Sequence, residues 1–121
     1  MVGERHRAIV HVCRLACESG DRAGLAAILH PRVVALTDDD GPVTAGALSI
    51  QGVQAVMSVI LRAVGRQDVV LTEEAVNGQT GLVLHRSGRV IGIMCFSLRG
   101  RLISQVWIIS STQRLRSWNR E

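Results

Sequence analysis

Three consecutive aspartates are the clearest chemical feature of the sequence. Asp38, Asp39 and Asp40 follow an apolar run, Val33 to Thr37, and precede a glycine and a proline in VVALTDDDGPVTAG. A carboxylate with a raised pKa at the mouth of a pocket could take up or deliver a proton. The same residues are also typical of a polar turn, in which aspartate bonds its own backbone ahead of glycine. Asp38 continues the alternation of the strand, so we expect its side chain to point inward.

Metal chemistry is not favoured by the spacing of the possible ligands. The aspartates lack the alternate ligands of a calcium loop. Cys13 and Cys17 are four residues apart on one helical face, but no histidine shares that face. With Cys95 they make an odd number of cysteines in apolar surroundings. They indicate reduced core thiols, and we expect no disulfide framework, no metal and no cofactor.

Further polar candidates lie in the second half of the chain. Glu73 and Glu74 alternate in direction, so one of them can face inward, where it would need a partner such as arginine or a proton. Asn77 stands before Gly78 in the pair preferred for a tight hairpin turn, but it could also bind a ligand carbonyl at a pocket rim. Trp107 lies in the middle of a strand, where it could line a pocket or an interface.

The composition indicates one globular domain over residues 1–121. The chain is 47% hydrophobic and carries a formal net charge of +4, which suits a single core. The arginines are scattered beside acids and aromatic residues make up only 2%, so we expect no nucleic-acid partner. No apolar run reaches membrane-spanning length, and the chain does not open with a secretory signal. We therefore expect a cytoplasmic protein without a membrane partner.

Helical patterns dominate the first half of the chain. Arg7, His11, Arg14 and Glu18 form the polar stripe of a first helix that ends at Gly20.

Two more helices are expected before the extended half. A second, short helix begins at its N-cap Asp21 and stops at His30-Pro31, because the residue before proline leaves the helical region. A loop then leads to Ser49, the expected N-cap of a third helix whose apolar stripe runs from Val53 to Val64.

After Gly65 the pattern becomes extended. The segments DVVLTEEAV, TGLVLHR, VIGIMCFSL and LISQVWII are joined by Asn-Gly, Ser-Gly and Arg-Gly pairs, which favour tight hairpins. These strands are apolar on both faces, so one face should meet the helices and the other a second copy of the sheet. Ser111 or Thr112 should cap a short final helix. We expect an α+β, cone-shaped fold in which three helices pack on a curved antiparallel sheet, with a pocket between helix and sheet.

The segment AVNGQTGLVLHRSGRVIGIMCFSLRGRLISQVWIISSTQRL resembles a known family. It is similar to the SnoaL-like (cystatin-like) branch of the nuclear-transport-factor-2-like superfamily, most of all to the C-terminal extension of extracytoplasmic-function sigma factors. The resemblance covers nearly the whole chain, and VNGQ followed by GLVL is its most specific part. Two regulatory signatures of that extension are altered here. The first reads DDDGPVTA and keeps Asp39 or Asp40 and Gly41 but lacks the basic residue; the second reads SSTQRL and keeps Leu115, with Arg114 as its basic residue. We expect a stand-alone relative.

The same superfamily contains ketosteroid isomerases, polyketide cyclases and epoxide hydrolases. The resemblance places their base at Thr37 or Asp38 and their oxyanion donors near Cys13 and Met94. Neither of the last two can replace a tyrosine or a protonated aspartate. A general base alone contributes roughly 10²–10⁴-fold, and charge stabilisation is usually the larger contribution, so classical isomerase chemistry is not expected.

The resulting hypothesis is a domain that binds a small apolar molecule in an apolar cavity, with a regulatory role left open. The alternative is a cofactor-independent cyclase, isomerase or epoxide hydrolase that uses Asp38, with Asp40, for acid–base chemistry. A third possibility is a structural homodimerisation module, if side chains fill the cavity. The expected ligand-binding residues are Cys13, Met57, Glu74, Asn77, Met94, Phe96 and Trp107.

Overall fold

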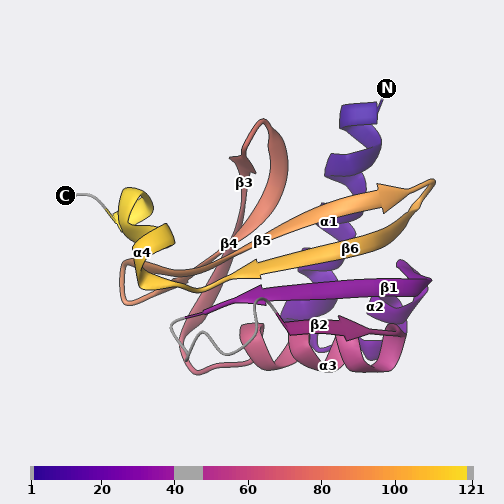
Figure 1. Ribbon diagram of the computed structural model, residues 1–121, viewed down its shortest axis with the longest axis horizontal. Coiled ribbons are helices and arrows are strands. Elements are labelled where there is room, and N and C mark those ends of the chain that lie inside the picture. The colour runs from indigo at the N-terminus through magenta and orange to yellow at the C-terminus, as the bar shows by residue number, and fades with distance from the viewer. Residues whose placement is uncertain (1, 40–47, 120–121) are drawn as a thin grey trace.

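The structure is a computed structural model that describes residues 2–39 and 48–119. Over these residues the chain forms, in order, α1 (Val2–Ser19), α2 (Arg22–Ala27), β1 (Leu29–Asp38), β2 (Leu48–Gln51), α3 (Val53–Val64), β3 (Val69–Val76), β4 (Gln79–Arg86), β5 (Arg89–Arg99), β6 (Leu102–Ile109), α4 (Thr112–Leu115) and the 3₁₀ turn η1 (Arg116–Asn119). The α+β class is confirmed. The described part holds four α-helices rather than three, the fourth being α4, the short final helix expected after Ser111 (Figure 1).

The sheet is mixed, which corrects the antiparallel expectation. Its strand order is β2-β1-β6-β5-β4-β3. The meander from β3 to β6 is antiparallel as expected, but β6 also pairs in parallel with β1. The last strand of the meander runs in the same direction as β1, and the apolar β1 gains a partner on each edge, β6 and β2.

Two expected helix boundaries are wrong for the same reason, because the residues expected at these helix ends belong to strands of the sheet. Ser49 does not cap α3, because it lies in β2 and pairs with Leu36. The N-cap is Gly52, whose φ of +95° suits glycine and whose N–H donates to Val33 O at 2.9 Å. His30 does not end α2, which stops at Ala27; it belongs to β1.

Two of the three expected hairpin pairs form the centre of a turn, whereas Arg99 of the third pairs with Leu102 at the end of its strand, so that turn is Gly100-Arg101. Asn77 and Gly78 have φ values of +52° and +83°, and Ser87 and Gly88 have +52° and +79°. Both pairs are left-handed at the two central positions, as a type I′ turn requires. These turns fix the register of β3 on β4 and of β4 at the start of β5.

The sheet has two faces with different covers. The helix face carries side chains such as Ala35, Leu82, Met94 and Val106, which form one continuous core with α1, α2 and α3. The open face is the opposite one, and it includes the paired residues Leu36, Cys95 and Trp107. Near one end of the open face, Leu115 of α4 packs on Val83, Val90 and Ile93 in a second, smaller cluster.

Candidate functional site

The candidate site lies where the two hairpins of the meander separate. The last paired residues of β4 and β5 are Leu82 and Met94. Beyond this pair, β4 continues with β3 as far as Gln79, while β5 continues with β6 as far as Arg99. Figure 1 shows the β3–β4 hairpin diverging from the β5–β6 hairpin. The edges of β4 and β5 therefore stop pairing here and leave room between the hairpins, which we name the hairpin cleft.

One side of the hairpin cleft is an open-face pocket of about 280 Å³. It is lined by Val76, Asn77, Gln79, Cys95, Phe96, Ser97, Gln105 and Trp107. Trp107 is 38% exposed, so part of its indole ring is accessible from this pocket. Burial raises the pKa of the half-buried Cys95 thiol, so this wall of the pocket is uncharged. The pocket combines apolar surface with amide groups.

The other side is a helix-face pocket of about 360 Å³. It is lined by Arg5, His6, Gln79, Phe96, Ser97, Leu98 and Gly100. Gln79, Phe96 and Ser97 line both pockets, so the two lie on either side of the same strand ends. His6 is only 6% exposed, and its Nε2 donates to Thr80 O at 2.9 Å.

Three of the expected ligand-binding residues meet in the open-face pocket: Asn77, Phe96 and Trp107. Asn77 lines this pocket and also has the left-handed backbone of a turn residue. The interpretations of Asn77 as a turn residue and as a residue at a pocket rim are therefore compatible.

The other apolar candidates do not line either pocket. Cys13, Met57 and Met94 belong to the continuous core with at most 2% exposure. The space expected between α1 and the sheet is therefore filled at these positions. The hydrogen bond with Cys17, together with burial, raises the pKa of Cys13, which fits a protonated core thiol.

The predicted catalytic carboxylates lie apart from the cleft or outside the described residues. Asp38 pairs in register with Ile109 on the open face, which corrects the expectation that it points inward. Its Oδ2 lies 2.6 Å from Arg114 Nε, and its carbonyl accepts from the N–H groups of Ser110 and Ser111. Asp40 lies outside the described residues.

Of the two neighbouring glutamates, Glu73 is the one whose side chain faces inward. Glu74 lies on the open face, where it contacts the Thr72 hydroxyl and where its Oε2 is 3.2 Å from His85 Nε2. The Thr72 hydrogen bond, more than the His85 contact, holds the pKa of Glu74 below its ordinary value, although burial opposes both. His85 is partly buried in this group.

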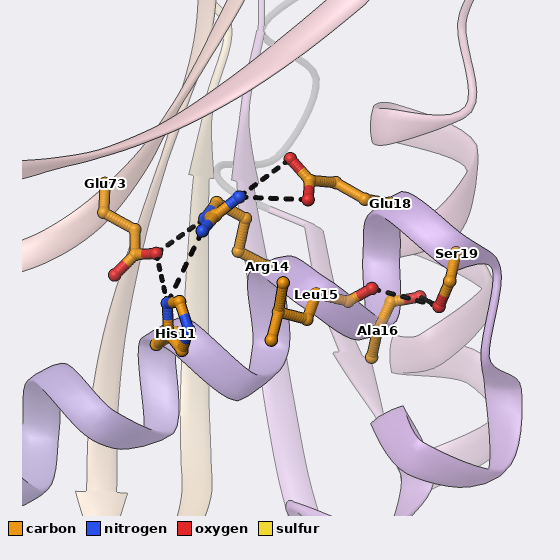
Figure 2. A network of polar contacts seen from close by, with 7 residues as sticks. All are labelled: His11, Arg14, Leu15, Ala16, Glu18, Ser19 and Glu73. Atoms are coloured by element: carbon orange, nitrogen blue, oxygen red, sulfur yellow. Dashed lines mark hydrogen bonds and ion pairs between the residues drawn. The ribbon is translucent and has the colours of Figure 1, made fainter.

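Glu73 faces α1 and joins a polar network that the sequence only hinted at. Its Oε2 lies 2.6 Å from Arg14 Nε and 2.7 Å from His11 Nδ1, and Arg14 also binds Glu18 at 3.0 Å (Figure 2). The polar stripe of α1 and the Glu73–Glu74 alternation were the available signals. The burial of His6 could not be predicted from the sequence, because a histidine in ERHR is typical of the polar start of a helix.

A larger pocket of about 620 Å³ lies elsewhere, between β5 and the C-terminal helical segment. Its lining includes the exposed Arg89, Thr112 and Arg116, and the Asn119 side chain there bonds both backbone groups of Val90. We favour the hairpin cleft, although each of its two pockets is smaller, because it brings together the expected residues and a buried histidine. Over residues 2–39 and 48–119, no group of three or more histidine, cysteine or acidic side chains could hold a metal ion. No helix in the same ranges is long and apolar enough to cross a membrane.

Comparison with solved structures defines the fold. The chain aligns with the extracytoplasmic function sigma factor SigJ of Mycobacterium tuberculosis at a TM-score of 0.65 and 23% identity, covering 87% of this chain and 41% of SigJ. An NTF2-like protein of Burkholderia xenovorans aligns at 0.60 and 16%, covering 98% of each chain. RV0760c of M. tuberculosis, in complex with estradiol-17β-hemisuccinate, aligns at 0.59 and 16%, covering 86% of this chain and 92% of RV0760c.

The chain thus has the NTF2-like, or cystatin-like, fold, and the resemblance drawn from the sequence is confirmed at that level. It spans less than half the length of SigJ. No protein-family model matches the chain, and no curated protein matches it significantly.

Proposed function

We propose that the chain is a cytoplasmic small-molecule-binding domain of NTF2-like fold, and that the hairpin cleft is its binding site. The main support for this proposal is that two pockets share Gln79, Phe96 and Ser97 at the point where β4 and β5 separate. Binding sites are typically concave, apolar surfaces with a few polar groups. Phe96, Leu98 and Trp107 supply the apolar surface, and the amides of Asn77, Gln79 and Gln105 supply polar groups.

The contacts of the carboxylates favour binding over catalysis. Asp38 is committed to Arg114 and to the chain that follows β6, and it does not line either cleft pocket. Glu73 is held by Arg14 and His11. The cleft therefore lacks, among the residues that the structure describes as its lining, a carboxylate that could act as a general base.

A regulatory output is proposed from the likeness to SigJ alone. The ion pair of Asp38 with Arg114 joins the two segments that resemble the sigma-factor signatures, DDDGPVTA and SSTQRL. A sigma factor is therefore the partner class to test, by co-purification with and without a cleft ligand. Loss of co-purification on Arg114→Ala would support regulation, and no co-purification in any condition would contradict it.

The binding proposal is tested by mapping a neutral probe onto the protein. Phenylbutanol, added to ¹⁵N-labelled protein, should shift backbone resonances near Asn77, Phe96 and Trp107. Ser97→Leu should reduce these shifts at least several-fold, because the exposed Ser97 lines both pockets and a leucine there occupies the cleft.

Ser117→Leu is the matched control, since Ser117 is exposed and lines neither cleft pocket. It should leave the shifts unchanged. Shifts confined to other surfaces, or an equal response of the two variants, would refute the hairpin cleft as the site.

A further inference from the structure

We propose that the ligand of the hairpin cleft is an amphipathic carboxylic acid, whose carboxylate binds Arg5 and His6 while its apolar body extends past Phe96 towards Trp107. This inference rests on the proposed function and adds the chemical class of the ligand. It starts from His6, a buried titratable side chain that neither the core nor the Glu73 network uses.

The orientation of the His6 ring is fixed by a single contact. Thr80 lies on β4 beyond the last pair with β5, and its carbonyl accepts the hydrogen bond from His6 Nε2 at 2.9 Å. A carbonyl oxygen only accepts, so Nε2 carries a hydrogen in either protonation state. The other ring nitrogen, Nδ1, is left as the group that can respond to a ligand.

Nδ1 is available from the pocket. It makes no hydrogen bond with any residue in the described part of the chain. No fully sealed side-chain nitrogen or oxygen in that part lacks a partner, so Nδ1 is not completely closed off from solvent. His6 lines the helix-face pocket, and the proposal places Nδ1 at that pocket. A protonated Nδ1 would donate to a carboxylate oxygen.

Arg5 supplies a permanent positive charge beside His6. It is exposed, lines the same pocket and has no ion pair with another residue that the structure describes. Its planar guanidinium can hold both oxygens of a carboxylate. The described lining of both cleft pockets contains no acidic residue to compete for it. Arg99 and Arg101 flank Gly100, which also lines the pocket, and add positive potential at this mouth.

The apolar part of the ligand follows from the residues beyond this polar mouth. Phe96 and Leu98 line the helix-face pocket, and Phe96 continues into the open-face pocket beside Trp107. A ligand with a carboxylate at one end and an aromatic or aliphatic body matches this order of polar and apolar surface. A neutral molecule would occupy the same apolar surface without using Arg5.

The test compares phenylbutanoate with phenylbutanol, which share a body and differ in the charged group. Wild-type protein should bind phenylbutanoate about tenfold more tightly, as expected for charge-assisted hydrogen bonds. Arg5→Gln and His6→Gln should each remove most of this preference, measured in each variant as the ratio of the dissociation constants of the two probes. Glutamine at position 6 keeps an N–H donor for Thr80 O. Arg66→Gln is the control for Arg5→Gln, because it also removes one exposed arginine.

The outcomes separate the two proposals. If neither probe shifts the cleft resonances, the proposed function itself fails. Equal binding of the two probes leaves the binding site standing and overturns the carboxylate. A preference for phenylbutanoate that survives both Arg5→Gln and His6→Gln also overturns it, and Arg5→Gln keeps this test valid if His6→Gln does not fold.

Discussion

The network between α1 and β3 makes a strong quantitative prediction, which is tested by Glu73→Gln. The Glu73 side chain is only 20% exposed and accepts from Arg14 at 2.6 Å and from His11 at 2.7 Å (Figure 2). Glutamine keeps the size of the side chain but removes the charge. Hydrogen bonds to charged groups contribute about 1.5–3 kcal/mol. Arg14 retains Glu18 and glutamine can still accept, so we expect a loss of about 1–2 kcal/mol in the free energy of unfolding at pH 7.

The matched control is Glu18→Gln, which removes a charge from the same arginine. Glu18 binds Arg14 four residues earlier on the same helix, and its side chain is 42% exposed. Such pairs on a helix surface contribute about 0.3–0.5 kcal/mol. Urea unfolding of the two variants beside wild type should therefore rank Glu73→Gln clearly below Glu18→Gln.

The pH dependence has a definite sign. Burial alone would raise the pKa of Glu73, but Arg14 and His11 together hold this pKa below its ordinary value. A carboxyl whose pKa is lowered by folding stabilises the protein fully above its unfolded pKa, about 4.3. That stability is lost as the pH falls through the lower folded pKa. The difference between wild type and Glu73→Gln should thus shrink below about pH 4.

Two results would refute this reasoning. One is a Glu73→Gln variant as stable as wild type at pH 7 within about 0.5 kcal/mol, the range of ordinary surface substitutions. The other is a difference that grows as the pH falls, which would mean that the uncharged carboxyl is the form preferred by the fold.

Two further predictions concern the core and the open face. Met94→Ala should lower the free energy of unfolding by about 2–5 kcal/mol, because Met94 is fully buried; a loss under about 1 kcal/mol in urea unfolding would point to empty space beside it. We also expect the open face around Trp107 to form the proposed homodimer, so light scattering should show Trp107→Ala dissociating at least about 30-fold more readily than wild type, as for an interface tryptophan. A wild-type protein that stays monomeric at high concentration would contradict the dimer.

Local signals in the sequence predicted the second half of the fold well. The turn pairs at Asn77 and Ser87 require left-handed backbone, and glycine follows each of them, so the hairpins could be placed from the sequence. The apolar stripe from Val53 to Val64 coincides with α3, although the expected N-cap, Ser49, lies before the observed one. These features depend on neighbours within a few residues, which a single sequence displays.

Features that depend on distant partners could not be predicted in this way. The segment Val33 to Leu36 is apolar at every position, so alternation could not show which side meets the helices. Ala35 is fully buried in the core, and therefore Leu36 and Asp38 turn to the open face. The parallel pairing of β1 with β6, and the choice of Ser49 for a strand, likewise depend on residues far along the chain.

The polar contacts of α1 connect the Glu73 network with the cleft. The apolar side of α1 packs into the core through Val10, Cys13 and Cys17, and apolar packing alone tolerates small shifts along the helix axis. Two directional contacts remove that freedom, one to Thr80 on β4 and one to Glu73 on β3. Both anchor α1 to the same hairpin, and neither involves β5. The width of the hairpin cleft is thus set by how far β5 departs from a helix that is fixed to the opposite wall. A ligand that spans Arg5 and Phe96 would bridge the two walls and stabilise the folded state by an amount that grows with the logarithm of its concentration divided by its Kd.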